Sequence, residues 1–229
     1  MRFDVLTLFP DVIEHYCNVS IMKRAQDGGV FEVSAINPRD FTLDKHKKVD
    51  DTPYGGGAGM VLAPQPYVDA YESIDKLENS ISVMLSPQGE PLCEKLVCDL
   101  AKYDQIIMLC GHYEGFDERI REIIKPKEIS VGDFVLTGGE LPALCLIDAV
   151  SRKIEGTLGK IESANEDSFS SGLLEYPQYT KPREYRGLCV PDVLLNGNHK
   201  EIAKFRLKQQ IERTKLRRPD LYEKYNKNN

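Results

Sequence analysis

The chain has 229 residues, of which 41% are hydrophobic and 29% are charged, and this composition is typical of a soluble globular protein with one or two domains. No apolar run approaches the length of a membrane span and the N-terminus has no signal-peptide pattern, so we expect a cytoplasmic protein without a membrane partner. The six cysteines include no CxxC pair, which argues against a zinc site or a disulfide framework.

Charge is divided unevenly along the chain. The net charge is −6, which taken alone argues against a nucleic-acid partner. Residues 173–229, however, hold 13 Lys and Arg against 7 Asp and Glu, a net of +6, whereas residues 1–172 hold 17 against 29, a net of −12. This asymmetry indicates an acidic body followed by a basic domain that can meet a polyanion. A basic terminus that is simply solvated is the alternative.

Strands and helices alternate over the first two thirds of the chain. Apolar and alternating runs predict strands at 3–9, 30–37, 81–85, 105–110 and 128–136. Helices are expected from Pro10, from the capping residue Ser20 to Gly28-Gly29, and at 66–79, 92–102, 117–125 and 141–154. This order predicts an α/β fold with a mainly parallel sheet between helices, and the pattern alone favours an unknotted, doubly wound sheet.

The segments between these elements suggest the domain organisation. Residues 39–59 are polar and rich in glycine, and a loop of that length is a functional candidate. Residues 156–172 combine Gly, Ser, Asn and acidic residues with few apolar ones, which is typical of a mobile linker. We therefore expect a domain over 1–155, a linker over 156–172 and a small basic helical domain over 173–229.

One long helix dominates the predicted basic domain. It is expected to begin after the capping residue Asn198 and to end before Pro219. Ala203, Leu207 and Ile211 form an apolar stripe at helical spacing, and Lys and Arg lie on both flanks of it. An ordinary amphipathic helix has a solvated face, but positive charge on both flanks favours contact with phosphate.

Two glycine motifs carry most of the functional information. Gly111-His112-Tyr113-Glu114-Gly115 follows the apolar strand 105–110, and residues 131–142, with the sequence VGDFVLTGGELP, precede a helix. Glycines at strand ends allow the backbone to approach a ligand closely, and open α/β sheets bind ligands at the carboxyl ends of their strands. Tight turns explain either loop alone, but the two together predict a small-molecule site.

The familiar nucleotide and hydrolase motifs are missing. The run at 55–59 has no following Lys-Ser/Thr, so it is not a P-loop, and no GxGxxG follows a strand. The sequence also has no HExxH and no GxSxG motif. These absences disfavour an NTPase, a Rossmann-type enzyme and the common hydrolases.

Together with Tyr54-Gly-Gly-Gly-Ala-Gly-Met60 and Glu166-Asp-Ser-Phe169, the two glycine motifs resemble those of the bacterial tRNA (guanine-N1)-methyltransferases. The likeness runs from Leu8-Phe9-Pro10 to Leu216-Arg217-Arg218-Pro219, nearly the whole chain. That family belongs to the knotted (SPOUT) class of methyltransferases, which use S-adenosylmethionine. The resemblance therefore implies a parallel sheet with a trefoil knot, a feature that is almost absent from proteins in general.

Three loops can meet the demands of an adenosyl cofactor, which needs main-chain groups for the adenine edge and an apolar slot for its ring. They are 85–87, 111–115 and 131–142, and the resemblance assigns the same loops to S-adenosylmethionine. The predicted cofactor-binding residues are Leu85, Ser86, Pro87, Gly111, Tyr113, Glu114, Val131, Gly132, Asp133, Phe134, Val135, Leu136, Gly138, Gly139 and Pro142.

Two charged residues become catalytic candidates only through the resemblance. Asp167 and Arg152 are by default solvated surface charges, but the resemblance maps Asp167 onto the general base and Arg152 onto the assisting arginine. The chemistry is consistent with these roles. Methylation of guanine N1 requires removal of the N1 proton, which a carboxylate can accept, and a guanidinium can stabilise the negative charge that develops towards O6.

Glu114 is the one candidate for a metal contact. It can meet the substrate or a bound Mg²⁺, and a structural salt bridge is an equally good interpretation. His46 lies in a charged run that is either solvated or in contact with RNA. The predicted tRNA contacts are Lys204, Lys208, Arg183 and His46.

The resemblance also implies an assembly and a substrate. It predicts a homodimer in which Asp167 of one subunit reaches the cofactor of the other. The implied substrate is the guanosine directly 3′ of the anticodon (tRNA position 37), preceded by another guanosine, where methylation protects the reading frame. The alternatives are another knotted methyltransferase, acting on ribosomal RNA or a ribose hydroxyl, and a non-catalytic RNA-binding protein that keeps the fold. A ribose enzyme does not need a carboxylate directed at a base nitrogen, and degenerate cofactor loops would be expected of a non-catalytic protein.

Overall fold

The structure, a computed structural model, describes residues 1–158 and 167–228. The chain divides into two compact units, Met1–Gly159 and Lys160–Asn229. Of the predicted linker 156–172, residues 159–166 lie outside the described residues, and the predicted domain boundaries stay predictions.

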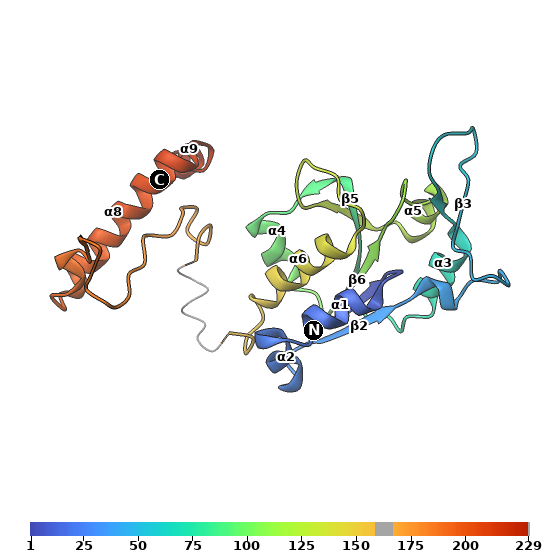
Figure 1. The fold of residues 1–229 in the computed structure, drawn as a ribbon, viewed down its shortest axis with the longest axis horizontal. Helices are drawn as coiled ribbons and strands as arrows, with labels where there is room; N and C mark the ends of the chain where they lie inside the picture. Colours follow the sequence, from blue (N-terminus) through green and yellow to red (C-terminus); the bar gives the residue numbers. More distant parts are fainter. Residues whose placement is uncertain (159–166, 229) are drawn as a thin grey trace. The chain divides into compact units, whose positions relative to one another are not determined.

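The first unit is a three-layer α/β structure (Figure 1). Its five-stranded sheet has the order β2-β1-β6-β5-β7, and all the strand pairs are parallel. The sheet strands are β1 (Arg2–Leu6), β2 (Glu32–Ile36), β5 (Ser80–Pro91), β6 (Gln105–Cys110) and β7 (Lys127–Ser130). The remaining elements are α1 (Pro10–Cys17), α2 (Ser20–Asp27), η1 (Pro38–Asp40), β3 (Asp50–Asp51), β4 (Val61–Leu62), α3 (Pro64–Glu72), α4 (Glu94–Leu100), α5 (Glu118–Ile124) and α6 (Glu140–Ser151).

Alternating side chains of the central strands form two cores. Ile106, Met108 and Cys110 of β6 pack in one core with residues of α1, α2, α4 and α6. Ile107 and Leu109 pack in the other, with residues of α3 and α5. All six residues of β6 are buried, because a parallel strand covered by helices on both faces has no polar side. The predicted parallel α/β fold is confirmed.

β5 is longer than the predicted strand 81–85. Its register against β7 shifts between Leu85 and Glu90, so residues 86–89 leave the ladder before pairing resumes. A Cβ on Gly89 would collide with the main chain of Ile129. The run SPQGEP has little strand propensity, and it is extended here because β7 lies beside it.

Several boundaries correct the sequence-based expectations. Ser20 is the first residue of α2 rather than its cap, and no side chain caps that helix. α3 begins at Pro64, because proline is tolerated in the first helical turn, and it ends at Glu72 rather than at residue 79. Strand β7 ends at Ser130, so residues 131–138 form a loop instead of continuing an extended segment.

The described part of the second unit contains a short hairpin and two helices. Its elements are β8 (Glu184–Tyr185), β9 (Leu188–Cys189), η2 (Asp192–Leu194), α8 (His199–Arg217) and α9 (Pro219–Asn228). Asn198 caps α8 as predicted, since its side chain accepts a hydrogen bond from the Glu201 N–H at 3.4 Å. The predicted apolar stripe of α8 is largely exposed, and its third member, Ile211, is half-buried. Ala203 and Leu207 are exposed, and the buried position of the helix is Thr214.

Candidate functional site

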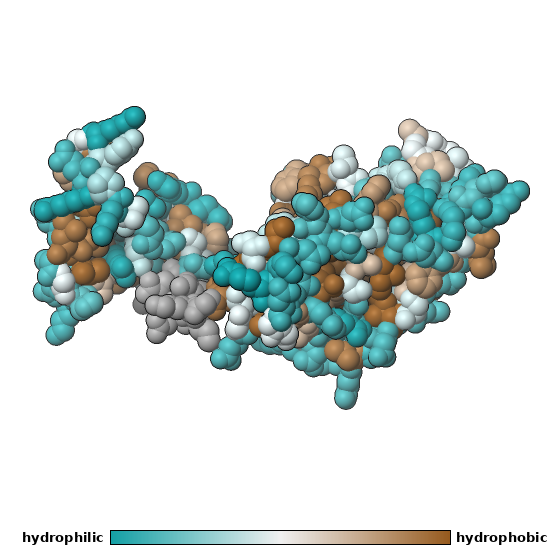
Figure 2. All heavy atoms as spheres, turned by 60° about the horizontal axis from the view of Figure 1, so that its bottom comes forward, coloured by the Kyte–Doolittle hydropathy of each residue, from teal (hydrophilic) through white to brown (hydrophobic). Residues whose placement is uncertain are grey.

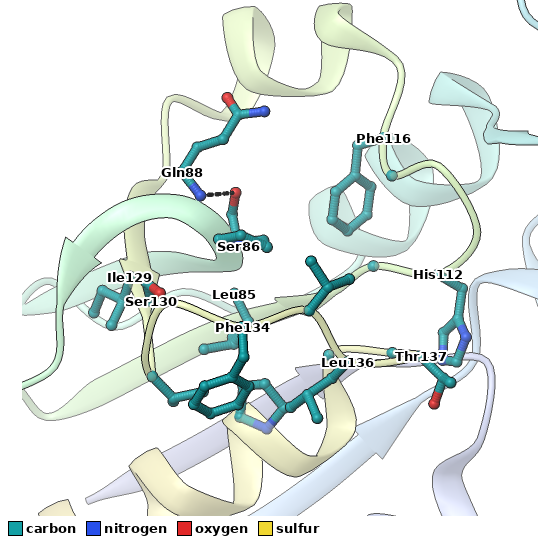
Figure 3. Close-up of a pocket in the computed structure, with 18 of the residues that line it drawn as sticks. Leu85, Ser86, Gln88, His112, Phe116, Ile129, Ser130, Phe134, Leu136 and Thr137 are labelled. Carbon is teal, nitrogen blue, oxygen red and sulfur yellow. Dashed lines mark hydrogen bonds between the residues drawn. The ribbon is translucent and has the colours of Figure 1, made fainter.

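A cavity of about 300 Å³ lies at the carboxyl ends of β5, β6 and β7. Its walls are the interrupted part of β5 at 85–88, the loop 111–116 after β6, and the end of β7 with the loop that follows it, 129–139, together with Pro142 of α6 (Figure 3). The Ser86 hydroxyl accepts a hydrogen bond from the Gln88 N–H at 3.1 Å and so shapes the interrupted part of β5. The two glycine motifs therefore meet at the edge of the sheet where a ligand was expected.

The loop after β6 is held by the main chain of its neighbours. Tyr113 and Gly115 have φ angles of 56° and 105°, in the region that favours glycine. The Glu114 N–H donates to the Met60 carbonyl at 3.0 Å, and the Leu62 N–H donates to the Gly115 carbonyl at 2.9 Å. The glycine-rich segment before β4 thus lies beside this wall of the cavity.

The second glycine motif packs tightly against the first. The Gly139 N–H donates to the Gly111 carbonyl at 2.9 Å, and His112 pairs with Gly138 in an isolated antiparallel bridge. A Cβ on Gly138 would collide with the His112 ring, and one on Gly139 would lie 2.6 Å from the Cα of Cys110. A side chain at Gly139 would therefore displace β6 instead of only narrowing the cavity.

Side-chain hydrogen bonds join the same loops. Glu140, at the start of α6, is buried between the Thr7 hydroxyl, 2.5 Å from one carboxylate oxygen, and His112 Nε2, 2.8 Å from the other. The His112 ring also packs against the Phe9 ring, with centroids 4.8 Å apart. Burial raises the pKa of the neighbouring Cys110 thiol well above its usual range, so this cysteine behaves as a small hydrophobe and not as a nucleophile.

The lining of the cavity includes apolar and charged side chains. Leu85, Leu136 and Pro142 are its apolar part, and Glu114 and Arg121 are charged. The Arg121 guanidinium pairs with Glu118 at 3.0 Å and with Glu128 at 3.2 Å. An apolar slot with glycine main chain beside it matches what an adenosyl group requires.

Nearly all the residues predicted to bind the cofactor line this one cavity, and Asp133 is the exception. The structure adds lining residues that the sequence analysis missed: Gln88, His112, Gly115, Phe116, Arg121, Ile129, Ser130 and Thr137. His112, Gly115 and Thr137 lie inside the two glycine motifs, so the motifs could have predicted them as lining residues. Gln88 lines the cavity because the register of β5 shifts there, and Arg121 does so because of the way α5 packs. No local sequence pattern predicts either feature.

The two catalytic candidates belong to different units. Arg152 is the exposed C-cap of α6 in the first unit, and its N–H donates to the Asp148 carbonyl at 3.2 Å. Asp167 is half-buried in a turn of the second unit, where its carbonyl accepts from the Ser170 N–H at 3.3 Å. That turn leads to Leu174, whose N–H donates to the hydroxyl of the buried Thr214 on α8 at 2.8 Å. Asp167 is thus attached to the helical part of its own unit.

The predicted RNA contacts are exposed and take part in ion pairs or lie next to charges. Lys204 pairs with Glu201 at 3.0 Å, Lys208 with Glu212 at 3.8 Å and Arg183 with Asp192 at 2.9 Å. Such exposed pairs contribute little to stability and exchange readily for other partners. The His46 N–H donates to the Asp44 carboxylate at 2.7 Å, within the exposed loop before β3.

An apolar surface covers α1 and the start of α6. Phe9, Val12 and Tyr16 on one side and Leu141 on the other are between 38% and 57% exposed. The Tyr16 hydroxyl donates to Asp148, and this hydrogen bond raises the pKa of Tyr16 to about 12. Figure 2 shows apolar side chains on the molecular surface among the hydrophilic ones.

Within residues 1–158 and 167–228, no group of three or more His, Cys, Asp or Glu side chains is placed to hold a metal ion. None of the helices in this part of the chain is both long and apolar enough to cross a bilayer.

Comparison with known proteins gives consistent matches over nearly the whole chain. The sequence model of the family described as tRNA (Guanine-1)-methyltransferase TrmD matches residues 1–224. The chain is 53% identical over 224 residues to the tRNA (guanine-N(1)-)-methyltransferase of Synechococcus sp. (strain JA-2-3B'a(2-13)), covering 98% of this chain and 89% of that protein. It is 52% identical over 225 residues to the enzyme of the same name from Staphylococcus aureus (strain JH9), covering 98% of this chain and 92% of that protein.

Proposed function

Since the chain belongs to the tRNA (guanine-1)-methyltransferase family, we propose that it transfers a methyl group from S-adenosylmethionine to N1 of a guanosine in tRNA. The observation that carries this proposal is the cavity at the carboxyl edge of the sheet, which is built from the two glycine motifs. We further propose that the target is the guanosine 3′ of the anticodon, at position 37, preceded by another guanosine. Methylation there blocks Watson–Crick pairing and so maintains the reading frame.

The cavity residues suit an adenosyl cofactor. Leu85, Leu136 and Pro142 would hold the flat ring, and the main chain around Gly132 and Gly138 would approach it without side-chain obstruction. When bound, the cofactor supplies a methyl group already activated by its positive sulfur. The protein therefore has mainly to orient the reactants and to manage one proton.

Asp167 would remove that proton, and Arg152 would stabilise the charge that its removal leaves on the base. Asp167 would accept the proton from guanine N1, which leaves the electron pair of the N–H bond on the nitrogen for attack on the methyl carbon. Arg152 would stabilise the negative charge that develops at O6. The exposed position of Arg152 and the half-buried position of Asp167 leave both accessible to a substrate.

A homodimer with a shared site is part of the proposal. The apolar surface on α1 and α6 supports it, because exposed apolar side chains grouped on neighbouring helices favour association. Asp167 of one subunit would then serve the cavity of the other. We also propose that the segment from β5 to α6 forms a trefoil knot, which would explain how the loop 131–139 comes to pack on the loop after β6.

The second unit would bind the tRNA. Its exposed Lys204, Lys208 and Arg183 are suitable for phosphate contacts, and His46 of the first unit would add another contact with the RNA. Glu114 remains a candidate for contact with the substrate or with Mg²⁺. A tRNA-modifying enzyme would work in the cytoplasm.

The direct test is incubation with labelled S-adenosylmethionine and total tRNA, followed by analysis of the nucleosides. The proposal expects 1-methylguanosine, and mapping should place it next to the anticodon. Label in 2′-O-methyl nucleosides, or in ribosomal RNA only, would support another knotted methyltransferase. Binding of tRNA without any transfer would support the non-catalytic alternative.

A further inference from the structure

A buried carboxylate lies behind the cavity wall. Glu140 is only 5% exposed, and both of its oxygens have a partner, in Thr7 and in His112. Burial of a carboxylate is costly unless its oxygens accept hydrogen bonds, so a residue of this kind is retained only where its partners are well placed.

The direction of these hydrogen bonds follows from the geometry. The Thr7 hydroxyl accepts the Phe9 N–H at 2.9 Å, which leaves its own proton for Glu140. The other carboxylate oxygen lies 2.8 Å from His112 Nε2 and accepts from it in the ring form that carries a hydrogen on that nitrogen. Glu140 therefore holds the orientation of the His112 ring and favours a hydrogen on Nε2.

The three residues come from three separate parts of the chain. Thr7 follows β1, His112 follows β6, and Glu140 follows the glycine pair that precedes α6. The main chain joins the same loops through the Gly139 N–H and the Gly111 carbonyl. Glycine segments have many accessible conformations and do not hold one conformation by themselves, so they need anchors of this kind.

We propose that Glu140, supported by Thr7, is a positioning residue that fixes His112 and so pre-organises both glycine loops for the cofactor. This inference rests on the proposed function. A loop that is already ordered loses less conformational entropy when a ligand binds, so loss of the anchor should weaken cofactor binding.

The opposite edge of the sheet offers a matched control. Asp4 of β1 is likewise a buried carboxylate with two partners, Arg2 at 2.9 Å and the Gln105 side-chain amide at 2.7 Å. These partners lie at the amino ends of β1 and β6, away from the glycine loops. Substitution of Asp4 should therefore destabilise the same strands without touching the cavity.

The experiment compares Glu140→Ala, Glu140→Gln and Asp4→Ala by calorimetric titration with S-adenosylmethionine and by thermal unfolding. We expect Glu140→Ala to raise the dissociation constant about tenfold or more, Glu140→Gln about threefold, and Asp4→Ala less than twofold. Both alanine variants should unfold at a lower temperature. The glutamine retains an acceptor for Thr7 and can pair with the other tautomer of His112, which is why it should preserve most of the affinity.

A second pair of variants covers the case in which Glu140→Ala does not fold. Thr7→Ser keeps the hydroxyl, whereas Thr7→Val keeps the shape and removes it. The serine should bind the cofactor about as the native protein does, and the valine should bind it about tenfold more weakly. Equal affinities in this pair would contradict the proposal.

Nuclear magnetic resonance of the cofactor-free protein gives an independent readout. The chain has four histidines, so the ring signals of His112 can be assigned by substitution. The Nε2–H form should dominate in the native protein, and the Nδ1–H form should gain in Glu140→Gln.

Two outcomes would overturn the inference, and they can be told apart. If the native protein binds S-adenosylmethionine but Glu140→Ala and Asp4→Ala bind it equally well, Glu140 is only structural. If the native protein neither binds the cofactor nor methylates tRNA, the proposed function fails and this inference fails with it.

Discussion

The two units of the chain differ in how they are held together. The first has two buried cores, one on each face of a parallel sheet, and loops that are fixed around a cavity. In the described part of the second unit the buried residues are few, namely Leu173, Tyr176 and Thr214, and α8 is largely exposed. The charge is also opposite in sign, −10 for residues 1–159 (16 Lys and Arg against 26 Asp and Glu) and +4 for residues 160–229 (14 against 10). The cavity of the first unit suits a small ligand, and the exposed basic second unit suits a large polyanion.

Asp167 gives the sharpest test of this difference between the units. It is the proposed proton acceptor, yet it belongs to the second unit, whereas the cavity belongs to the first. Asp167→Asn should lower the rate of methyl transfer by roughly 10²–10⁴-fold. Its affinity for S-adenosylmethionine, measured by calorimetry, should not change. Asp220→Asn is the matched control, since Asp220 is an exposed carboxylate of the same unit that pairs with Arg218 at 2.7 Å. Near-native turnover in Asp167→Asn would show that the proton leaves by another route.

A substitution at Leu136 tests whether the cavity of the first unit binds the cofactor. Leu136→Glu places a carboxylate in the apolar part of the cavity, so the dissociation constant for S-adenosylmethionine should rise roughly 10–100-fold. Binding of tRNA should stay native-like in a filter assay. Ile123→Glu, on the exposed face of α5, is the control and should change neither affinity. A cavity variant that binds the cofactor normally would mean that the ligand occupies another site.

Mixing these two variants tests whether the units of different subunits cooperate. If Asp167 serves the partner's cavity, a heterodimer of Asp167→Asn and Leu136→Glu has one complete site. At a cofactor concentration well below the dissociation constant of Leu136→Glu, random mixing should then restore about a quarter of the native rate, whereas both parent homodimers should be nearly inactive. Mixed dimers that form but remain inactive would place the base and the cofactor in the same subunit.

The smallest expected effect belongs to the basic unit. Lys204→Glu with Lys208→Glu should weaken tRNA binding about tenfold and flatten its salt dependence, because fewer counterions are released. Lys23→Glu is the control in the first unit, since Lys23 is also exposed and paired, with Asp27 at 3.2 Å. An unchanged salt slope in the double variant would mean that the RNA docks elsewhere, for example on the loop around His46.

Local patterns predicted the central strands well, because a short run of consecutive apolar residues such as 105–110 is typical of a parallel strand that helices cover on both faces. They also predicted which glycines meet at the cavity. They failed where a residue's position depends on a distant neighbour. The second half of β5 is extended only because β7 lies beside it. The buried face of α8 is the one that contains Thr214, because the segment around Leu174 hydrogen-bonds to that residue. For the same reason the sequence pointed to Gly139 as a cavity residue without revealing that it packs on β6.

That close packing has a consequence for inhibitors. The part of the cavity around Gly111, Gly138 and Gly139 is main chain, and a side chain at any of the three would meet the Phe116 ring, the His112 ring or β6. A compound that binds through these backbone groups would face a surface that single substitutions cannot alter without disturbing the sheet or its neighbours. Resistance should therefore arise at the exposed side chains of the lining, such as Phe134 and Val135, and compounds that avoid these side chains should be the harder ones to escape.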